Sequence, residues 1–561
     1  MKASETSLRN LLEGGKQFQI PLFQRPYAWE RKNWETLWED ILSLYNGEVE
    51  GSYFLGPIVT QAIPGTADGI SPFVVIDGQQ RLITLTILLA TLRDHLIKQK
   101  NDSLADELYE LYLINKFKQS NDSYKVLPTQ DDRDTYKKII SKEDTSELEG
   151  KSKVSEAYVF FDNQIQKWYS ERETNLELAK LKIVILENLR LVNITSEDED
   201  NPYLIFESLN HKGQALTQAD LVRNYIFMKL PAEKREKIYQ NEWLPFQEKF
   251  KADMKEDEYV EELTKAFWFY LRKDGKGVSQ KEVYKAIKKR CDNSEKGIEY
   301  EIKEIVRFTN YYQRLNFNHR EPEPRLNTWF KRLLRLKFNT CHIFLLNVYH
   351  EYEAKLLSIQ DFENILLYLE SYFVRRLFAG VSTQVLGNVF NNLYQEVKDS
   401  KNLVNDLREV LMSYEGKKVW PNDDDFRKGI VNKSIYSSGS IDRVKLILER
   451  LENFQSKELV DPQPLNIEHI MPQKLTREWK TLLGTNCDSI QKQYLHTLGN
   501  LTLTGYNSEL SNKSFAEKKS IYQKSNLSLN KSFKDVETWN VGTIQKRAEY
   551  LADIAIKVWP R

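Results

Sequence analysis

The sequence predicts a multidomain α+β protein with an α/β domain first, a helical region in the middle and a small mixed domain last. A chain of 561 residues is too long for one ordinary hydrophobic core. Short strand-like runs alternate with helical patterns in the first part, whereas residues 230–416 are almost wholly helical in pattern. Strand-like runs return near the C-terminus. We therefore expect domains at residues 1–230, 231–430 and 431–561.

The composition is that of a soluble globular protein, with 41% hydrophobic and 29% charged residues. No apolar run approaches the roughly 18 residues that span a bilayer, so we expect no membrane partner. The start, MKASETSLRNLLEGG, lacks a signal-peptide pattern, and three cysteines without a CxxC pair favour the reducing cytoplasm. Lys plus Arg equals Asp plus Glu, at 81 each. This balance neither favours nor excludes nucleic acid, because binding depends on local phosphate contacts.

The first domain is expected to begin with a strand and a rigid turn, FQIPLFQRPYAW, in which Pro21 and Pro26 fix the backbone around Gln24 and Arg25. NWETLWEDILSLY has apolar residues at helical spacing, and SYFLGPIVTQ and FVVID read as buried strands. QQRLITLTILLATLRDHL predicts a buried helix. IVILENLRLVNIT predicts a strand pair or one long strand, followed by an acidic turn and a helix with IFESLN.

The stretch FVVIDGQQRLITL places a charged loop between a buried strand and a helix. A helix N-terminus offers unpaired N–H groups and positive potential to a phosphate. Gly78 permits close backbone approach, and Arg81 can contact phosphate oxygens in bidentate fashion. No GxxxxGK[ST] is present, which excludes a P-loop NTPase on its own motif.

Two basic runs stand out in the helical middle, WFKRLLRLKF and VRRLF. They contain Lys331, Arg332, Arg335, Lys337, Arg375 and Arg376. Such runs are more often a solvated helix face than a nucleic-acid path. On a DNA path, each residue would add salt-dependent phosphate contact without reading sequence.

The C-terminal region carries NIEHIMPQ and, about thirty residues later, HTLGNLTLTGYNSELSN. NIEHI predicts a short strand, and LGNLTLT a second strand with Leu501 and Leu503 on one face. NSELSNKSFAEKK predicts a helix capped by Ser508 or Asn507. Two strands and a helix can bring a histidine, a carboxylate and amide oxygens to one point.

That set of groups suits phosphodiester hydrolysis. A hard cation with oxygen ligands stabilises the leaving oxygen, and a neutral imidazole takes a proton from the attacking water, an effect of about 10²–10⁴ in rate. A neighbouring oxygen can hold the ring in one tautomer.

The arrangement resembles the HNH (ββα-metal) nucleases. The resemblance implies that His469 is the general base, Asn500 the middle asparagine of the catalytic set and Glu468 a metal ligand. Asn507 or, less well, Asn512 would be the closing metal ligand. The chain has Glu where many members have Asp, and a final Asn in place of His. His496 lies close by, as a structural or a site residue.

The pair IPLFQRPYAW and DGQQRL, together with the HNH block, resembles the GmrSD family of modification-dependent restriction enzymes. The resemblance continues through YLIFESLNHKGQALTQADLVRNYIF and ESYFVRRLF. It implies a ParB/sulfiredoxin-like N-terminal fold with a nucleotide or DNA-sensing pocket. The implied pocket residues are Gln24, Arg25, Asp77, Gly78, Gln79, Gln80 and Arg81. Asn210 and Asp220 would help to close it, although Asp220 also suits a helix N-terminus, and Tyr27 and Trp29 either stack on a base or lie buried.

The resulting expectation is a cytoplasmic, Mg²⁺- or Mn²⁺-dependent DNA endonuclease of anti-phage defence. Its N-terminal domain would bind an NTP and sense modified double-stranded DNA, and the helical domain at residues 231–430 would couple it to the HNH nuclease domain. A double-strand break would need two chains, as in a homodimer, or two successive nicks. The alternatives are a ParB-like, NTP-dependent DNA-binding switch with a non-catalytic HNH domain, and an RNA-cleaving effector.

Overall fold

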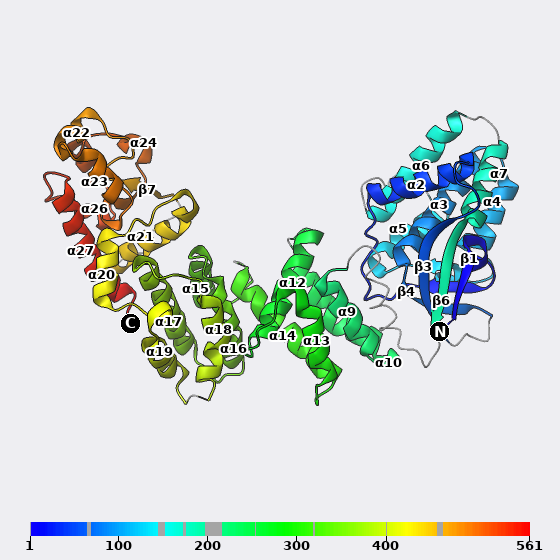
Figure 1. The fold of residues 1–561 in the computed structure, drawn as a ribbon, viewed down its shortest axis with the longest axis horizontal. Helices are drawn as coiled ribbons and strands as arrows, with labels where there is room; N and C mark the ends of the chain where they lie inside the picture. Colours follow the sequence, from blue (N-terminus) through cyan, green and yellow to red (C-terminus); the bar gives the residue numbers. More distant parts are fainter. Residues whose placement is uncertain are drawn as a thin grey trace. The chain divides into compact units, whose positions relative to one another are not determined.

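The computed structural model of the chain describes residues 2–63, 69–143, 152–171, 175–196, 216–252, 254–317, 320–399, 401–456 and 464–561 (Figure 1). Its residues pack into two compact units. The first comprises Met1–Glu261 and Tyr284–Lys303, and the second comprises Glu262–Val283 and Glu304–Arg561. The division into three domains at residues 230 and 430 stays a prediction.

The first unit is built on a mixed six-stranded sheet in the order β1-β6-β3-β4-β2-β5. The strands are β1 (Lys2–Ser7), β2 (Lys16–Gln19), β3 (Tyr53–Ala62), β4 (Ser71–Asp77), β5 (Val126–Leu127) and β6 (Leu189–Ser196). The β1–β6 and β3–β4 pairs are antiparallel, and the other pairs are parallel. The strands predicted from FVVID and SYFLGPIVTQ are confirmed as β4 and β3.

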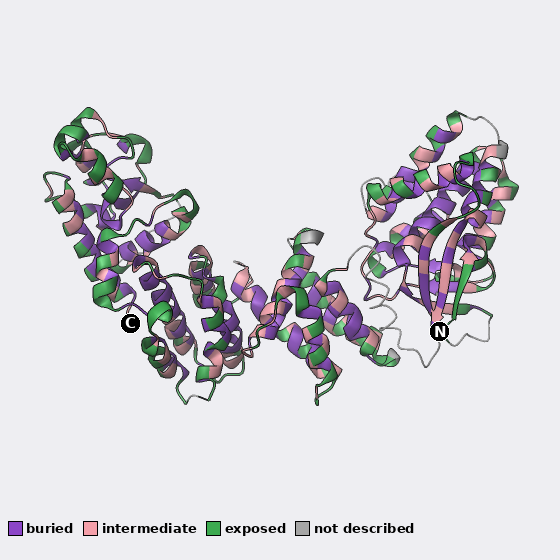
Figure 2. Ribbon diagram, viewed as in Figure 1, coloured by how far each residue is buried: buried purple, intermediate pink, exposed green. Residues whose placement is uncertain are grey.

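Helices cover the sheet of the first unit and bury its apolar residues (Figure 2). The helices of this unit, not all of which lie on the sheet, are α1 (Leu8–Leu12), α2 (Arg31–Asn46), α3 (Gln79–Lys98), α4 (Asp102–Leu108), α5 (Gln130–Ile140), α6 (Lys153–Ser170), α7 (Asn175–Ile183), α9 (Gln218–Lys229), α10 (Ala232–Ile238), α11 (Leu244–Lys251) and α13 (Val283–Asp292). The largest core lies under α2, α3 and α6, while Leu221 and Met228 of α9 pack on a smaller cluster of sheet residues.

One predicted element of this unit is wrong in its first half. IVILENLRLVNIT was expected to be strand throughout, but Val184–Asn188 form a π-helical turn and β6 begins only at Leu189. Val184, Ile185 and Leu186 are buried by helix packing. A short apolar run fits a buried helix as well as a buried strand, so its pattern could not decide. The IFESLN segment lies outside the described residues.

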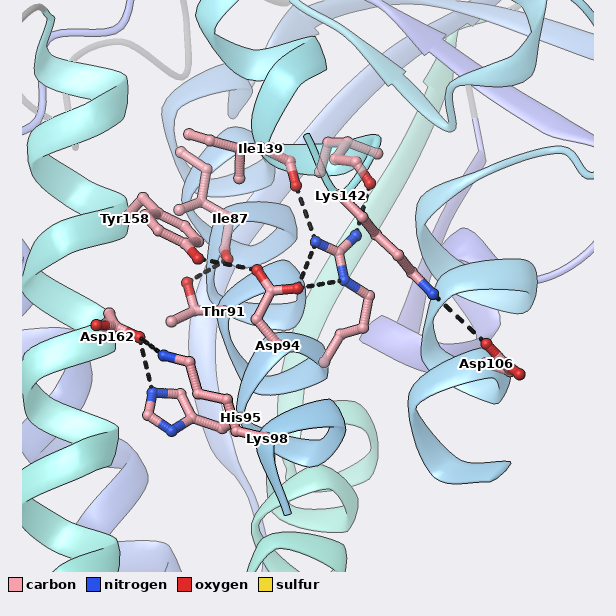
Figure 3. Close-up of polar contacts among 12 residues, drawn as sticks. Ile87, Thr91, Asp94, His95, Lys98, Asp106, Ile139, Lys142, Tyr158 and Asp162 are labelled. Carbon is pink, nitrogen blue, oxygen red and sulfur yellow. Dashed lines mark hydrogen bonds and ion pairs between the residues drawn. The ribbon is translucent and has the colours of Figure 1, made fainter. Parts of the chain in front are cut away.

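Helix α3 is the central helix of this unit, and its polar residues are tied to the helices around it (Figure 3). The buried Arg93 donates to the backbone oxygens of Ile140 at 2.6 Å and Ile139 at 2.9 Å. Tyr158 of α6 donates to Asp94 at 2.9 Å. Asp162 of α6 pairs with His95 at 2.9 Å and Lys98 at 3.1 Å, which lowers the pKa of Asp162 to about 2. These contacts fix the helix whose first turn is the DGQQR loop.

The second unit is helical apart from one antiparallel pair of strands, which two α-helices separate in the sequence and which is called the hairpin below. Its helices are α15 (Pro324–Arg335), α16 (His342–Glu353), α17 (Ile359–Phe378), α18 (Leu386–Val397), α19 (Leu403–Ser413), α20 (Asp423–Asn432), α21 (Ile441–Gln455), α22 (Arg477–Leu483), α23 (Cys487–Tyr494), α24 (Asn507–Leu510), α25 (Phe515–Tyr522), α26 (Ser528–Lys531) and α27 (Val541–Val558). Residues of α12 (Glu256–Arg272) and α14 (Ile298–Asn316) belong to both units. The helical middle region is therefore confirmed.

The basic run VRRLF is neither a solvated helix face nor a DNA path. Arg375 and Arg376 are at most 1% exposed. Arg375 donates to the backbone oxygens of Trp559 at 2.8 Å and Pro421 at 3.1 Å, and Arg376 to that of Val419 at 2.9 Å. Buried guanidinium groups with these partners hold the unit together. In the other run, Arg335 is paired with Glu449 of α21, while Lys331 is exposed.

The C-terminal hairpin pairs β7 (Asn466–His469) with β8 (Leu501–Thr504), antiparallel, and places His469 opposite Leu501. The strand predicted at NIEHI is thus confirmed, whereas LGNLTLT is a strand only from Leu501, because Leu498–Asn500 form a 3-10 turn. The single helix predicted after them is wrong, because α24 stops after Leu510 and α25 starts at Phe515. Ser511 has a φ of +40°, which ends the first helix, and Ser514 with Glu517 forms a capping box that starts the second.

In the part of the chain that the structure describes, no helix is both long enough and apolar enough to cross a membrane.

Candidate active site and charged loop

Strand β7 ends in the pair Glu468–His469, whose side chains point to opposite faces of the hairpin. His469 is 5% exposed, with its Nε2 lying 3.0 Å from Nδ1 of His496 and its Nδ1 lying 3.4 Å from Nε2 of Gln473. Tyr436 meets the His469 ring edge-on and stacks on the His496 ring, with centroids 4.7 Å and 5.4 Å apart. The predicted residues His469 and His496 therefore belong to one cluster.

The environment of His469 disfavours its charged form. Burial, then the neighbouring His496 and the charge of Lys518, lower the pKa of His469 to about 4 from an ordinary value of 6.5. Burial also lowers the pKa of His496. His469 is consequently neutral at physiological pH, the form that can accept a proton.

Asn500 holds the segment that follows β7. Its side-chain amide donates to the backbone oxygens of Met471 at 3.1 Å and Leu495 at 3.0 Å. Its Oδ1 accepts from the backbone N–H of Met471 at 2.8 Å and from Trp539 Nε1 at 3.0 Å. These contacts fix the backbone beside His469. Because Asn500 is fully buried, its side chain has no surface that a substrate could touch. The predicted catalytic asparagine is thus placed as a positioning residue.

Gly499 and Arg547 complete this support from α27. A Cβ atom on Gly499 would lie 2.5 Å from the backbone oxygen of Ile544, so only glycine permits this approach. The Arg547 guanidinium donates to the backbone oxygens of Gly499 at 2.9 Å and Leu501 at 2.8 Å. The LGN motif is therefore a clamp between the hairpin and α27.

Glu468 faces a buried lysine on the other side of β7. Lys518 of α25 is fully buried, and its Nζ donates to Glu468 Oε1 at 2.5 Å and to the backbone oxygen of His469 at 2.9 Å. Burial raises the pKa of Glu468, and Lys518 opposes that shift. One ammonium group thus neutralises the carboxylate and anchors the His469 backbone.

The predicted metal ligands do not come together as a formed cation site. Glu468 is engaged by Lys518, Asn507 is exposed in the first turn of α24, and Asn512 lies after the break at Ser511. Among the described residues, no group of three or more His, Cys, Asp and Glu side chains could hold a metal. The residues present therefore do not fit a pre-formed magnesium site.

The charged loop of the first unit turns at Gly78, whose φ is +90°. A Cβ atom there would lie 2.8 Å from the backbone oxygen of Pro57, so Gly78 is required for packing on β3. Arg81 also reaches β3, where its guanidinium donates to the backbone oxygen of Pro57 and lies 3.2 Å from the Cβ position of Gly56. The close approach predicted for Gly78 is thus made to the chain's own strand.

Opposite charges gather around Asp77 at the end of β4. Burial raises the pKa of Asp77, and Arg81, the Gly78 backbone N–H and Arg25 oppose that shift. Burial lowers the pKa of Arg25, opposed by the carboxylates of Asp220 and Asp77. Arg25, Asp77, Arg81 and Asp220 thus share one electrostatic neighbourhood, as the resemblance implied for the pocket.

Other predicted pocket residues hold the QRPYAW turn in place. Gln24 is 2% exposed and donates to the backbone oxygens of Val75 at 2.9 Å and Ile76 at 3.1 Å. Gln80 accepts from the Ala28 backbone N–H at 2.7 Å and donates to the Pro26 backbone oxygen at 3.2 Å. These two glutamines join the turn to β4 and α3, and Gln79 beside them is also buried.

Tyr27 is part of the core. It is 4% exposed, and its hydroxyl lies 2.6 Å from Thr84 Oγ1 and accepts from Trp34 Nε1 at 2.8 Å. Its ring is therefore not available to stack on a base, whereas Trp29 is partly buried at the rim of a pocket. Asp220 forms a capping box with Thr217 and pairs with Arg223 at 2.8 Å, so it does serve the start of a helix. Asn210 lies outside the described residues.

The pattern of the sequence missed Lys518, Trp539 and Gln473, which contact predicted residues directly, and Arg547, which binds the backbone on both sides of Asn500. Gln473 lies four residues after His469 outside any helix, so its spacing gave no signal. Lys518 looks like any lysine of a polar helix, and only the fold places it under β7.

The chain thus combines an α/β unit that carries a charged strand-to-helix loop with a helical unit that carries a buried histidine cluster. Residues 8–227 match the family model described as GmrSD restriction endonuclease, N-terminal domain, and residues 420–554 match that of the GmrSD restriction endonucleases, C-terminal domain. The two matches together span more than half of the chain, and it belongs to the GmrSD restriction endonuclease family. This membership supports nuclease activity with DNA as partner. No curated protein matches the chain.

Proposed function

We propose that this chain is an endonuclease that cleaves modified DNA at an HNH-type site centred on His469. One observation carries the proposal: His469 is a buried imidazole whose pKa lies near 4, held beside His496 on a strand that Asn500 fixes. A base that is neutral at working pH and oriented by its neighbours is what removal of a proton from water requires.

His469 can act as a general base only through the ring nitrogen that does not carry the proton, so its tautomer decides which nitrogen accepts the proton from water. With the proton on Nε2, His469 donates to Nδ1 of His496 across 3.0 Å, and its Nδ1 lone pair faces the side-chain amide of Gln473 at 3.4 Å. In the proposed reaction, the attacking water takes the place of this Gln473 amide at the Nδ1 lone pair. His496 is then a positioning residue. As His469 takes a proton from the water, the resulting hydroxide bonds to phosphorus, the bond from phosphorus to the leaving oxygen of the DNA backbone breaks, and that oxygen takes a proton from solvent.

The resemblance implies Mg²⁺ or Mn²⁺ as the cation beside the scissile phosphate. Oxygen ligands such as Glu468 and Asn507 have the right chemistry for such a cation. In the arrangement described above, however, Lys518 neutralises Glu468. That cleavage requires a divalent cation is therefore a prediction, which the cleavage assay described below tests.

We further propose that the first unit senses modified DNA and binds an NTP through a ParB-like loop. Arg25 and Arg81 flank Asp77 at the N-terminus of α3, a setting suited to phosphate oxygens. Gln24 Oε1 is buried and finds no hydrogen-bond partner among the described residues, which leaves one acceptor beside the same loop. An NTP, when bound, would supply phosphates for the guanidinium groups to contact.

The test is a cleavage assay with Mg²⁺, Mn²⁺ or EDTA, with and without NTP. Its substrates are plain DNA, DNA with glucosylated hydroxymethylcytosine, phosphorothioate DNA and transfer RNA. Cation-dependent cutting of one modified DNA, or cutting blocked by one modification, supports the proposal. Cutting of RNA while every DNA survives favours the RNA-cleaving effector, and DNA binding without any cutting favours the binding switch.

A further inference from the structure

A pocket lies beside the charged loop, on the side of Arg81 that faces α2 and β3. It encloses about 350 Å³, within the range of small-ligand sites. Its lining comprises Trp29, Lys32, Asn33, Thr36, Leu37, Asp40, Tyr53, Phe54, Leu55 and Arg81. Every one of these residues belongs to the first unit.

A β-bulge shapes this pocket. The register of β3 on β6 shifts between Phe54 and Gly56, and Gly56 has a φ of +116°. Successive residues of a regular strand point to opposite faces, yet Tyr53, Phe54 and Leu55 all line the same pocket. The bulge turns the strand so that two neighbouring aromatic residues face one space, and bulges serve this purpose at binding sites.

The aromatic lining is open to solvent. Phe54 is 58% exposed, and Trp29 and Tyr53 are only partly buried against the main core. Phe54 is thus accessible to a ligand in this pocket. Three aromatic side chains around one space suit a flat, unsaturated ligand.

Polar groups supply the rest of a recognition site. Asp40 and Tyr53 are joined by a side-chain hydrogen bond, and Asn33 adds an amide. A carboxylate accepts hydrogen bonds from an exocyclic amine such as the N4 of cytosine. Arg81 and Lys32 bring positive charge to the same pocket, as a ligand that carries phosphate requires.

We propose that this pocket binds an unpaired nucleobase attached to phosphate, stacked on Trp29 and Phe54 with its phosphate toward Arg81. The base comes either from a free nucleotide or from a nucleotide turned out of DNA, and both offer the same chemistry. The inference rests on the proposed sensing role of the first unit and names the site at which sensing occurs.

The test measures binding to full-length protein carrying His469→Ala, so that cleavage does not enter. The probes are GTP, ATP and hydroxymethylcytosine-containing duplex DNA with 2-aminopurine beside the modified base. Phe54→Ala and Trp29→Ala should weaken at least one class of probe about tenfold or more, since base–aromatic stacking has that magnitude. Phe54→Trp keeps a stacking ring and should restore binding. Phe117→Ala is the matched control, because Phe117 is 91% exposed in the same unit and lies outside the pocket.

Each outcome has one meaning. Loss with GTP or ATP alone assigns the pocket to a free nucleotide, and loss with DNA alone, together with a rise in 2-aminopurine fluorescence in the parent protein, assigns it to an extruded base. Probe binding that Phe54→Ala and Trp29→Ala both retain, with thermal unfolding as in the control, overturns the pocket and leaves the sensing role intact. No binding of any probe by the parent protein overturns the pocket and the proposed sensing role together.

Discussion

Burial lowers the pKa of His469, and this sets a pH dependence. Its pKa of about 4 lies below the ordinary 6.5, so His469 stays neutral until the pH falls to about 4. We expect the acidic limb of single-turnover cleavage near pH 4 to 5 rather than near 6.5. A pH–rate profile of wild-type protein checks this, and a limb centred at 6.5 would contradict the burial of the ring.

The same shift predicts a change in stability. A histidine whose pKa is depressed in the folded state contributes stability that is present above pH 6.5 and is lost as pH falls toward 4. The midpoint temperature for thermal unfolding of the second unit should therefore fall as the pH is lowered from 6.5 to 4. The His469→Ala protein should show a shallower fall.

His496 should act through the hydrogen bond to His469. Asn carries Oδ1 close to the position of Nδ1, so His496→Asn keeps an acceptor for His469 Nε2 and should retain most activity. His496→Leu removes the acceptor and should slow single-turnover cleavage about 100-fold, the cost of misplacing a catalytic group. Equal loss in both variants would show that the ring itself, and not its acceptor, is needed.

Lys518 should be essential for stability and for activity alike. Lys518→Met leaves Glu468 buried without its counter-charge, which costs about 3–5 kcal/mol of unfolding free energy. Chemical denaturation measures this loss. The control is Lys519→Met, one residue along the same helix and partly exposed. Unchanged stability of Lys518→Met would mean that Glu468 finds another partner.

For single residues, the sequence predicted the site best where neighbours in the chain form the motif. The place of His469 on a strand next to Asn500 was predictable because EHIMP is followed at a suitable separation by the GNLTLT element, while its catalytic role stays a prediction. The role of Asn500 was half predictable: its place in the site was clear, but its four contacts to Met471, Leu495 and Trp539 depend on folding. Lys518 was unpredictable, since only the packing of α25 on β7 removes it from solvent.

At the scale of elements, the clamp between the hairpin and α27 should be sensitive to a single methyl group. Gly499→Ala places a Cβ 2.5 Å from the Ile544 backbone oxygen and should destabilise the protein by about 1–3 kcal/mol. Gly439→Ala is the control, because nothing lies within 4 Å of a Cβ there. The melting temperatures of the two variants compare them. Equal melting temperatures would show that α27 can move away at no cost.

The residues at which helices and strands begin and end were harder to predict than the elements themselves. The hairpin strands and α2 followed from strong periodicity. The helix predicted over NSELSNKSFAEKK breaks at Ser511, because Ser514 and Glu517 cap a new helix and no apolar stripe runs through the break. The π-helical turn at Val184–Asn188 shows the opposite case, in which an apolar run satisfies either state.

At the scale of the whole molecule, the two family matches lie in separate units that each have their own core. The sequence indicated both ends, because each carries a motif, and the coupling role expected for the helical middle stays a prediction. With the one HNH-type site per chain that we propose, each chain would cut one strand at a time. Supercoiled DNA should therefore appear first as nicked circles, and linear product should form later or require two chains.

The most direct measurement is the single-turnover rate of nicking of a supercoiled plasmid bearing the favoured modification, for wild-type protein and for His469→Ala. The account predicts a loss of at least about 100-fold in the variant, with DNA binding and melting temperature unchanged. Nicking by His469→Ala at the wild-type rate would contradict the account and place the cutting centre elsewhere in the chain.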